Sequence, residues 1–137
     1  MKNPTTSENS KILLVEDHAA NVMVATLYLQ QYGYSYDVAS NGTEALEMVK
    51  TGGYSTILMD VQMDGMDGLE ATRQIRAYES GAAIHRTPII GMTAMALSGD
   101  RERCLDVGMD DYISKPFNPF ELEQKLITFT TLRNRAA

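Results

Sequence analysis

Apolar runs of strand length alternate along the chain with segments whose apolar residues recur at helical spacing. Five strands are predicted, at Lys11–Val15, Tyr34–Ala39, Ser55–Met59, Pro88–Met92 and Asp111–Ser114. The segments that follow them predict helices at Ala19–Tyr32, at Thr43–Thr51, at Leu69–Tyr78, from a cap at Ser98 to Val107, and at Phe117–Leu132. Apolar residues three or four positions apart share one face of a helix, whereas short continuous runs are typical of buried strands.

This alternation predicts an α/β fold with a parallel sheet and helices on both faces, because strand–helix–strand units form right-handed crossovers. The runs Ile12–Val15 and Ile89–Ile90 are apolar without alternation, as expected for strands that are buried on both sides. We expect one domain at residues 10–132, preceded by a disordered tail at residues 1–9 and followed by a frayed tail at residues 133–137.

Spacing also predicts which face of the first and last helices is buried. The inward residues of the first helix are predicted to be Val24, Ala25, Tyr28, Leu29 and Tyr32. Those of the last helix are predicted to be Phe120, Leu122, Leu126, Ile127 and Phe129. Asp110 and Asp111 are predicted to be solvated caps, and Cys104 a small hydrophobic residue within its helix.

The composition is that of an ordinary single globular domain, with 137 residues, 44% of them hydrophobic and 22% charged. Asp and Glu number 18 and Lys and Arg 12, which gives a net charge of −6 and argues against direct binding of nucleic acid. The single cysteine excludes an internal disulfide and fits a reducing compartment. Because no apolar run is long enough for a membrane span or a signal peptide, we expect a cytoplasmic location without membrane contact.

Candidate chemistry gathers at the ends of the predicted strands. Glu16 and Asp17 follow the first strand, Asp60 the third, Thr93 the fourth and Lys115 the fifth. Ligands of open parallel sheets bind outside the carboxyl ends of the strands, so these side chains should converge. Crowded carboxylates need a cation, their oxygens suit Mg²⁺, and a carboxylate can attack phosphorus to give an acyl phosphate. The sequence therefore predicts Mg²⁺-assisted phosphoryl transfer to a carboxylate.

Five motifs, in this order, resemble the receiver domain of two-component response regulators. They are Val15-Glu16-Asp17, Leu58–Met63, Met66-Asp67-Gly68, Met92-Thr93-Ala94 and Lys115-Pro116. The segments Met66–Arg76 and Gly108–Pro116 are similar to receiver modules of hybrid sensor histidine kinases. The resemblance spans roughly residues 10–132 and implies a flavodoxin-like fold, a five-stranded parallel sheet of order 2-1-3-4-5.

The resemblance implies a role for each matching residue. Asp60 would be the phosphoacceptor, and Glu16, Asp17, Asp60 and the backbone carbonyl of Gln62 would hold Mg²⁺. Two features depart from the family pattern: Asp64 stands where proline is usual, and His18 where asparagine or aspartate is usual. His18 and His85 are given no ligand role, because lone histidines near loops seldom have one.

The remaining implied roles concern the phosphoryl group and its readout. Thr93, the Ala94 amide and Lys115 would bind the phosphoryl oxygens, and the Lys115–Pro116 peptide bond would be cis. Thr93 and Tyr112 would form a switch that remodels the face built by the fourth helix, the fifth strand and the fifth helix.

The implied donor is a phosphohistidine on a histidine kinase or on a histidine phosphotransfer protein. Met23 and Leu27 lie four positions apart and outside the apolar stripe of the first helix, so we hypothesise that they dock this donor. The alternative for these two residues is ordinary surface exposure.

Four interpretations of function stay open. The first is a receiver within a hybrid histidine kinase, and the second is a stand-alone single-domain regulator. The third is a Mg²⁺-dependent phosphatase with an aspartate nucleophile, although phosphatases of the haloacid dehalogenase type have a second aspartate where Gln62 stands. The fourth is a receiver-like interaction module that is never phosphorylated.

Overall fold

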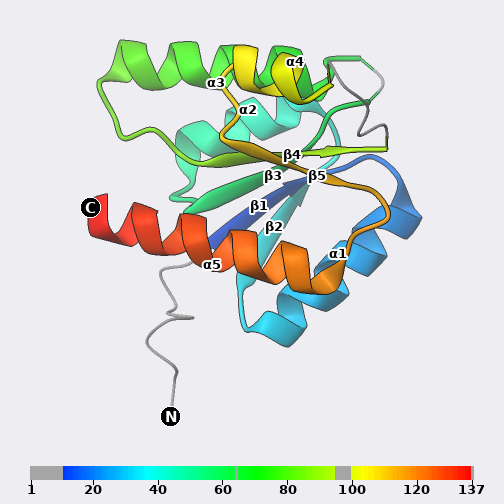
Figure 1. Ribbon diagram of the computed structural model, residues 1–137. Helices are drawn as coiled ribbons and strands as arrows, with labels where there is room; N and C mark the ends of the chain where they lie inside the picture. The colour runs from blue at the N-terminus through cyan, green and yellow to red at the C-terminus, as the bar shows by residue number, and fades with distance from the viewer. Residues whose placement is uncertain (1–10, 64, 95–99, 137) are drawn as a thin grey trace.

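The computed structural model describes residues 11–63, 65–94 and 100–136, in which strands and helices alternate (Figure 1). The strands are β1 (Lys11–Val15), β2 (Ser35–Ala39), β3 (Thr56–Asp60), β4 (Ile89–Thr93) and β5 (Asp111–Ser114). The helices are α1 (Ala19–Tyr32), α2 (Gly42–Thr51), α3 (Gly68–Ala82), α4 (Asp100–Asp106) and α5 (Pro119–Ala136). All ten elements were predicted, with bounds that agree within a few residues except at the ends of α3 and α5.

The strands form one five-stranded sheet of order β2-β1-β3-β4-β5, and every neighbouring pair is parallel. Helices α2, α3 and α4 cover one face of the sheet, and α1 and α5 cover the other (Figure 1). The predicted strand order and layering are therefore confirmed. Because all strands run the same way, their carboxyl ends lie together at one edge.

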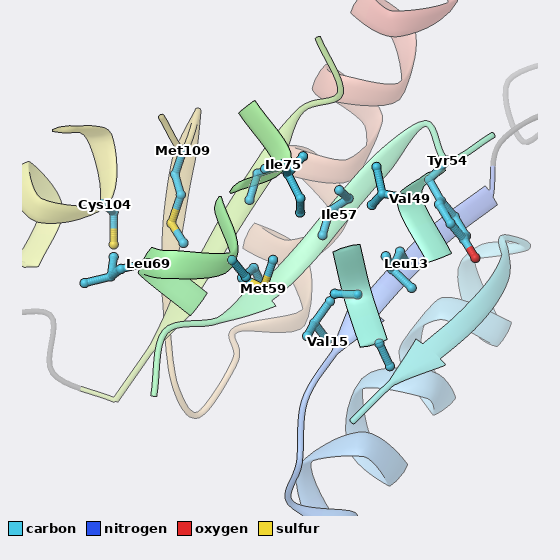
Figure 2. Packing of buried hydrophobic residues seen from close by; sticks show 14 residues of the cluster. Leu13, Val15, Val49, Tyr54, Ile57, Met59, Leu69, Ile75, Cys104 and Met109 are labelled. Atoms are coloured by element: carbon cyan, nitrogen blue, oxygen red, sulfur yellow. The ribbon is translucent and has the colours of Figure 1, made fainter. Parts of the chain in front are cut away.

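Each face of the sheet carries its own hydrophobic core, and successive residues of a strand alternate between the two. In β1, Leu13 and Val15 pack under α2 and α3, whereas Ile12 and Leu14 pack under α1 and α5. Figure 2 shows the first core, which extends from Tyr54 at one end to Cys104 and Met109 at the other. Burial on both faces explains why these strands are continuous apolar runs in the sequence.

The predicted inward faces of α1 and α5 need correction. Val24 is 43% exposed, and its predicted place in the core is taken by Val22, two residues earlier. In α5, Phe120 is 70% exposed and Ile127 is 44% exposed. Ala25 and Leu29 in α1 and Leu122 and Leu126 in α5 are buried as predicted, and Thr130 of α5, which was not predicted, is buried with them. Each actual stripe is narrower than the set of apolar residues, so the spacing alone assigned too many residues to the core.

Two helices continue beyond their predicted ends. Helix α3 passes Gly81 and ends at Ala82, and the next residue, Ala83, takes a left-handed conformation with φ of 56°. The carboxylate of Glu79 accepts hydrogen bonds from Arg76 and from the Thr87 N–H, which ties this last turn to the chain that leads into β4. Helix α5 extends to Ala136, where a frayed tail was predicted.

Some predictions concern residues outside the described ranges. These are the disordered tail at residues 1–9, the cap at Ser98 and the departure from the family pattern at Asp64. Within residues 11–63, 65–94 and 100–136, no helix is both long and apolar enough to cross a membrane.

Candidate functional site at the carboxyl edge of the sheet

The carboxyl ends of the strands bring five predicted residues to one edge. Glu16 and Asp17 directly follow β1, Asp60 and Thr93 are the last residues of β3 and β4, and Lys115 follows β5. The Lys115 N–H donates to the Thr93 carbonyl at 2.8 Å, which continues the pairing of β4 and β5 past the end of β5. Residues that are up to 99 positions apart in sequence thus become neighbours through sheet topology.

A buried ion-pair network forms the centre of this site. The Lys115 ammonium lies 2.7 Å from Glu16 Oε1 and 3.1 Å from Asp60 Oδ1. Glu16 Oε2 also accepts a hydrogen bond from the His18 N–H at 3.1 Å, and Asp60 Oδ1 accepts one from the Gln62 N–H at 3.2 Å. Since Glu16 and Asp60 are only 2% and 3% exposed, one ammonium is shared by two carboxylates that are largely removed from water.

This arrangement shifts the titration of its members. Burial, followed by the hydrogen bond and the negative charge of Glu16, raises the pKa of Asp60 to about 6, although Lys115 opposes the shift. Burial lowers the pKa of Lys115, but its hydrogen bond to Glu16 and the charge of Asp60 outweigh that effect, so its pKa is raised. With Asp17 as a third carboxylate, the cluster has an excess of negative charge that a cation can relieve. Its carboxylate oxygens fit a divalent cation that prefers oxygen ligands.

Next to the cluster lies a cleft of about 390 Å³ in which a phosphoryl group can be accommodated. It is lined by Asp17, His18, Val61, Gln62, Met63, Asp67, Leu69, Thr93 and Arg103. Sequence reasoning singled out Asp17, Gln62 and Thr93 for this region but missed Arg103, an exposed residue of α4. The sequence does hold a signal for Arg103. Helix α4 follows β4 and therefore starts near the same edge of the sheet, and Arg103 is a basic residue of this helix directly before the inward Cys104.

The loop after β3 is held close to the site by a glycine. Gly68 begins α3, and a Cβ at this position would collide with the backbone carbonyl of Asp60. The Gly68 N–H donates to the Val61 carbonyl at 3.1 Å, and the preceding residue, Asp67, caps α3 by accepting from the Glu70 N–H. The motif Met66-Asp67-Gly68 thus has a local reason: only glycine allows this close approach of the loop to Asp60.

Other predicted residues lie outside the ion-pair network. Ala94 is exposed just after β4, Tyr112 is half-buried in β5, and Met23 and Leu27 are 65% and 51% exposed on α1. The Lys115–Pro116 peptide bond is cis, which confirms that prediction.

The prediction of solvated caps at Asp110 and Asp111 is wrong. Asp110 accepts from Arg76 and Arg86 at 2.9 Å each, and Asp111 pairs with Lys125 at 2.7 Å. Cys104 is buried among apolar residues, as predicted.

The sequence matches a known protein family. The response regulator receiver domain profile matches residues 12–127. Hybrid signal transduction histidine kinase B of Dictyostelium discoideum is 44% identical over 125 residues, which cover 85% of this chain but 6% of the kinase. The chain therefore spans a small part of that curated relative.

Two solved structures are also similar. The receiver domain of sensor histidine kinase PA1611 from Pseudomonas aeruginosa, crystallised with a magnesium ion in its active-site cleft, is 43% identical with a TM-score of 0.80, over 89% of this chain and 98% of that one. A co-crystal structure of the Saccharomyces cerevisiae histidine phosphotransfer protein Ypd1 with the receiver domain of the response regulator Ssk1 matches with 31% identity and a TM-score of 0.84, over 90% of each chain.

Proposed function

Because the chain belongs to the response regulator receiver domain family, we propose that it accepts a phosphoryl group from a phosphohistidine onto Asp60. The observation that carries this proposal is the buried Asp60 carboxylate, which shares Lys115 with Glu16 beside an open cleft. Mg²⁺ would be held by Asp17, by Asp60, by Glu16 largely through water, and by the backbone carbonyl of Gln62. When bound, the ion would neutralise charge on the transferred group.

In the proposed reaction, Asp60 attacks the phosphorus atom of the donor. Lys115 and the Gln62 N–H both contact Oδ1 of Asp60, so we assign Oδ2 as the attacking oxygen. A bond forms between Oδ2 and phosphorus while the phosphorus–nitrogen bond of the phosphohistidine breaks, and the donor imidazole leaves with the electron pair. Lys115 then pairs with a phosphoryl oxygen, and the Thr93 hydroxyl and the Ala94 N–H donate to the others.

The proposed readout starts at Thr93. Movement of Thr93 toward the phosphoryl group would leave space into which Tyr112 turns, and this changes the surface formed by α4, β5 and α5. Support comes from the register of the sheet, which pairs Thr93 with Ser114, two residues beyond Tyr112 in β5.

Incubation with acetyl phosphate and Mg²⁺, followed by intact-mass measurement, tests the acceptor. We expect one added phosphoryl group on the wild-type chain and on Asp106→Asn, a matched change at an exposed aspartate of α4, and none on Asp60→Asn. Release of free phosphate from many phosphomonoesters would instead support the phosphatase. Absence of both products would support an interaction module that is never phosphorylated.

We further propose that the donor docks on α1, beside the cleft. Met23, Val24 and Leu27 are all exposed and form an apolar patch on the helix that begins next to Asp17. The similarity to kinases and to a receiver crystallised with a histidine phosphotransfer protein favours a donor of this class, and favours a place for this domain within a hybrid histidine kinase.

We also propose the cytoplasm as the compartment of this domain. The buried thiol of Cys104 is consistent with that compartment.

A double change tests this docking surface. Met23→Glu with Leu27→Glu should slow phosphoryl transfer from a phosphorylated histidine phosphotransfer domain but leave labelling by acetyl phosphate intact. Ile127→Glu, at an exposed apolar position of α5, is the matched control and should leave both rates unchanged. Equal transfer to all three proteins would exclude α1 as the docking surface.

A further inference from the structure

His18 lies where it can add a nitrogen ligand to the carboxylate cluster. Its Nδ1 is 3.6 Å from Asp17 Oδ1, and ligand atoms of Glu16, Asp17 and His18 all lie within 4.8 Å of one another. The side chain is 78% exposed and lines the cleft, so an ion entering from solvent can reach it. We propose that His18 and Asp17 jointly bind divalent first-row transition metals, Mn²⁺ among them, in preference to Mg²⁺. This inference rests on the proposed metal site.

The backbone of His18 is held in place, which gives its imidazole a defined origin. The His18 N–H donates to buried Glu16 Oε2 at 3.1 Å, and the His18 carbonyl accepts from the Val22 N–H at 3.0 Å in the first turn of α1. Only side-chain torsions therefore need to change for metal binding. Two adjacent ligands of one ion lie about 3 Å apart when each metal–ligand bond is about 2.1 Å. A rotation of the exposed imidazole that brings Nδ1 about 0.6 Å closer to Asp17 Oδ1, from 3.6 Å, is therefore enough.

The chemistry of the donor set determines which ions gain from His18. Mg²⁺ prefers oxygen ligands and keeps several waters, so it gains little from an imidazole. Co²⁺ and Zn²⁺ bind imidazole nitrogen well, and Mn²⁺, although it also suits carboxylate and water, accepts an imidazole nitrogen more readily than Mg²⁺ does. Asparagine or aspartate at this position would offer only oxygen as a metal ligand, so His18 should change the order of metal preference without removing the carboxylates.

Mn²⁺ binding followed by electron paramagnetic resonance tests the proposal. We expect pulsed measurements to detect ¹⁴N coupling to bound Mn²⁺ in the wild-type chain and to lose it in His18→Asn. The chain has one other histidine, His85, which is exposed in the loop before β4, so His85→Asn is the matched control and should keep the coupling. His18→Asn should also weaken Mn²⁺ binding about ten-fold, while the affinity for Mg²⁺ stays within about two-fold.

Other outcomes would overturn the inference. One such outcome is that Mn²⁺ bound to the wild-type chain shows no nitrogen coupling. The other is that His18→Asn loses as much Mg²⁺ affinity as Mn²⁺ affinity. Either outcome would mean that His18 only pairs with Asp17. The readout requires no phosphorylation, so the two proposals can fail separately. A chain that is phosphorylated but lacks the coupling contradicts the His18 inference alone, and a chain with the coupling that accepts no phosphoryl group contradicts the proposed function alone.

Discussion

Two clusters of charged side chains lie at opposite ends of the sheet and differ in their balance of charge. At the carboxyl ends of the strands, Glu16 and Asp60 share Lys115, and Asp17 adds a third carboxylate. At the amino ends of β4 and β5, two arginines meet two carboxylates, from Arg76, Arg86, Glu79 and Asp110. In the cluster at the amino ends, the positive and negative charges cancel, and we call it the balanced cluster. In the acidic cluster at the carboxyl ends, negative charge is in excess, and a bound cation can neutralise it. Imbalance of this kind distinguishes a binding site from a structural ion-pair network.

The balanced cluster joins three parts of the chain. Arg76 of α3 donates to the carbonyls of Thr87 and Gly108 at 2.8 Å each, and to Glu79 and Asp110 at 2.7 and 2.9 Å. It therefore holds α3, the entry to β4 and the turn between α4 and β5 together, on the side of the sheet where α3 and α4 lie in Figure 1. With its side chain only 14% exposed, Arg76 has little access to water as a substitute partner.

The largest predicted effect concerns this network. Arg76→Ala should lower the free energy of unfolding by about 3–5 kcal/mol, because it removes the arginine that pairs with the buried carboxylate of Glu79 and one of the two arginines that pair with half-buried Asp110. Arg73→Ala is the control, since Arg73 pairs with Glu70 on the exposed side of α3 and should contribute about 0–1 kcal/mol. Urea unfolding measures both changes. If the two variants lost equal stability, the network at the amino ends would not be structural.

The second prediction concerns the acidic cluster without metal. Asp60→Asn should raise the free energy of unfolding in EDTA by about 2–3 kcal/mol at pH 8, because ionised Asp60 is destabilising where its folded pKa of about 6 exceeds its ordinary pKa of 3.8. The penalty is present above pH 6, decreases as the pH falls, and is absent below about pH 4, where Asp60 is protonated in both states. Unfolding curves at pH 8 and pH 4 measure this dependence.

Magnesium provides the control for this prediction. Saturating Mg²⁺ should stabilise the wild-type chain and reduce the difference between it and Asp60→Asn. A variant that is less stable than the wild type in EDTA at pH 8 would contradict the view that the acidic cluster has unrelieved charge.

The same contrast explains how far the sequence predicts the structure. The strands and the acidic site were predictable, because continuous apolar runs mark strands buried on both faces and parallel strands end at one edge. The inward position of Val22 in place of Val24 was not predictable. Both residues are apolar and lie two positions apart, so only the packing of α1 against the rest of the core determines which of them is buried. Asp110 was misjudged because Arg76, its partner, is 34 positions away and no local pattern links the two residues.

Arg103 is the cleft residue that the sequence reasoning missed, and it leads to the smallest predicted effect. Arg103 lines the same cleft as Asp17, so it brings a positive charge to the neighbourhood of the acidic cluster. Arg103→Gln should reduce the rate of phosphorylation by dilute acetyl phosphate about two- to five-fold at low ionic strength, because an anionic donor is attracted less strongly.

Arg101 provides the matched control for this effect. It is an exposed arginine of the same helix that does not line the cleft, so Arg101→Gln removes the same charge two residues away and should change the rate less. Arg103→Lys should retain most of the wild-type rate, and the difference between the wild type and Arg103→Gln should shrink in 0.5 M salt, because screening weakens long-range attraction. A loss that persists at high salt, or that Arg101→Gln reproduces, would mean that Arg103 does not act through the charge it presents to the cleft.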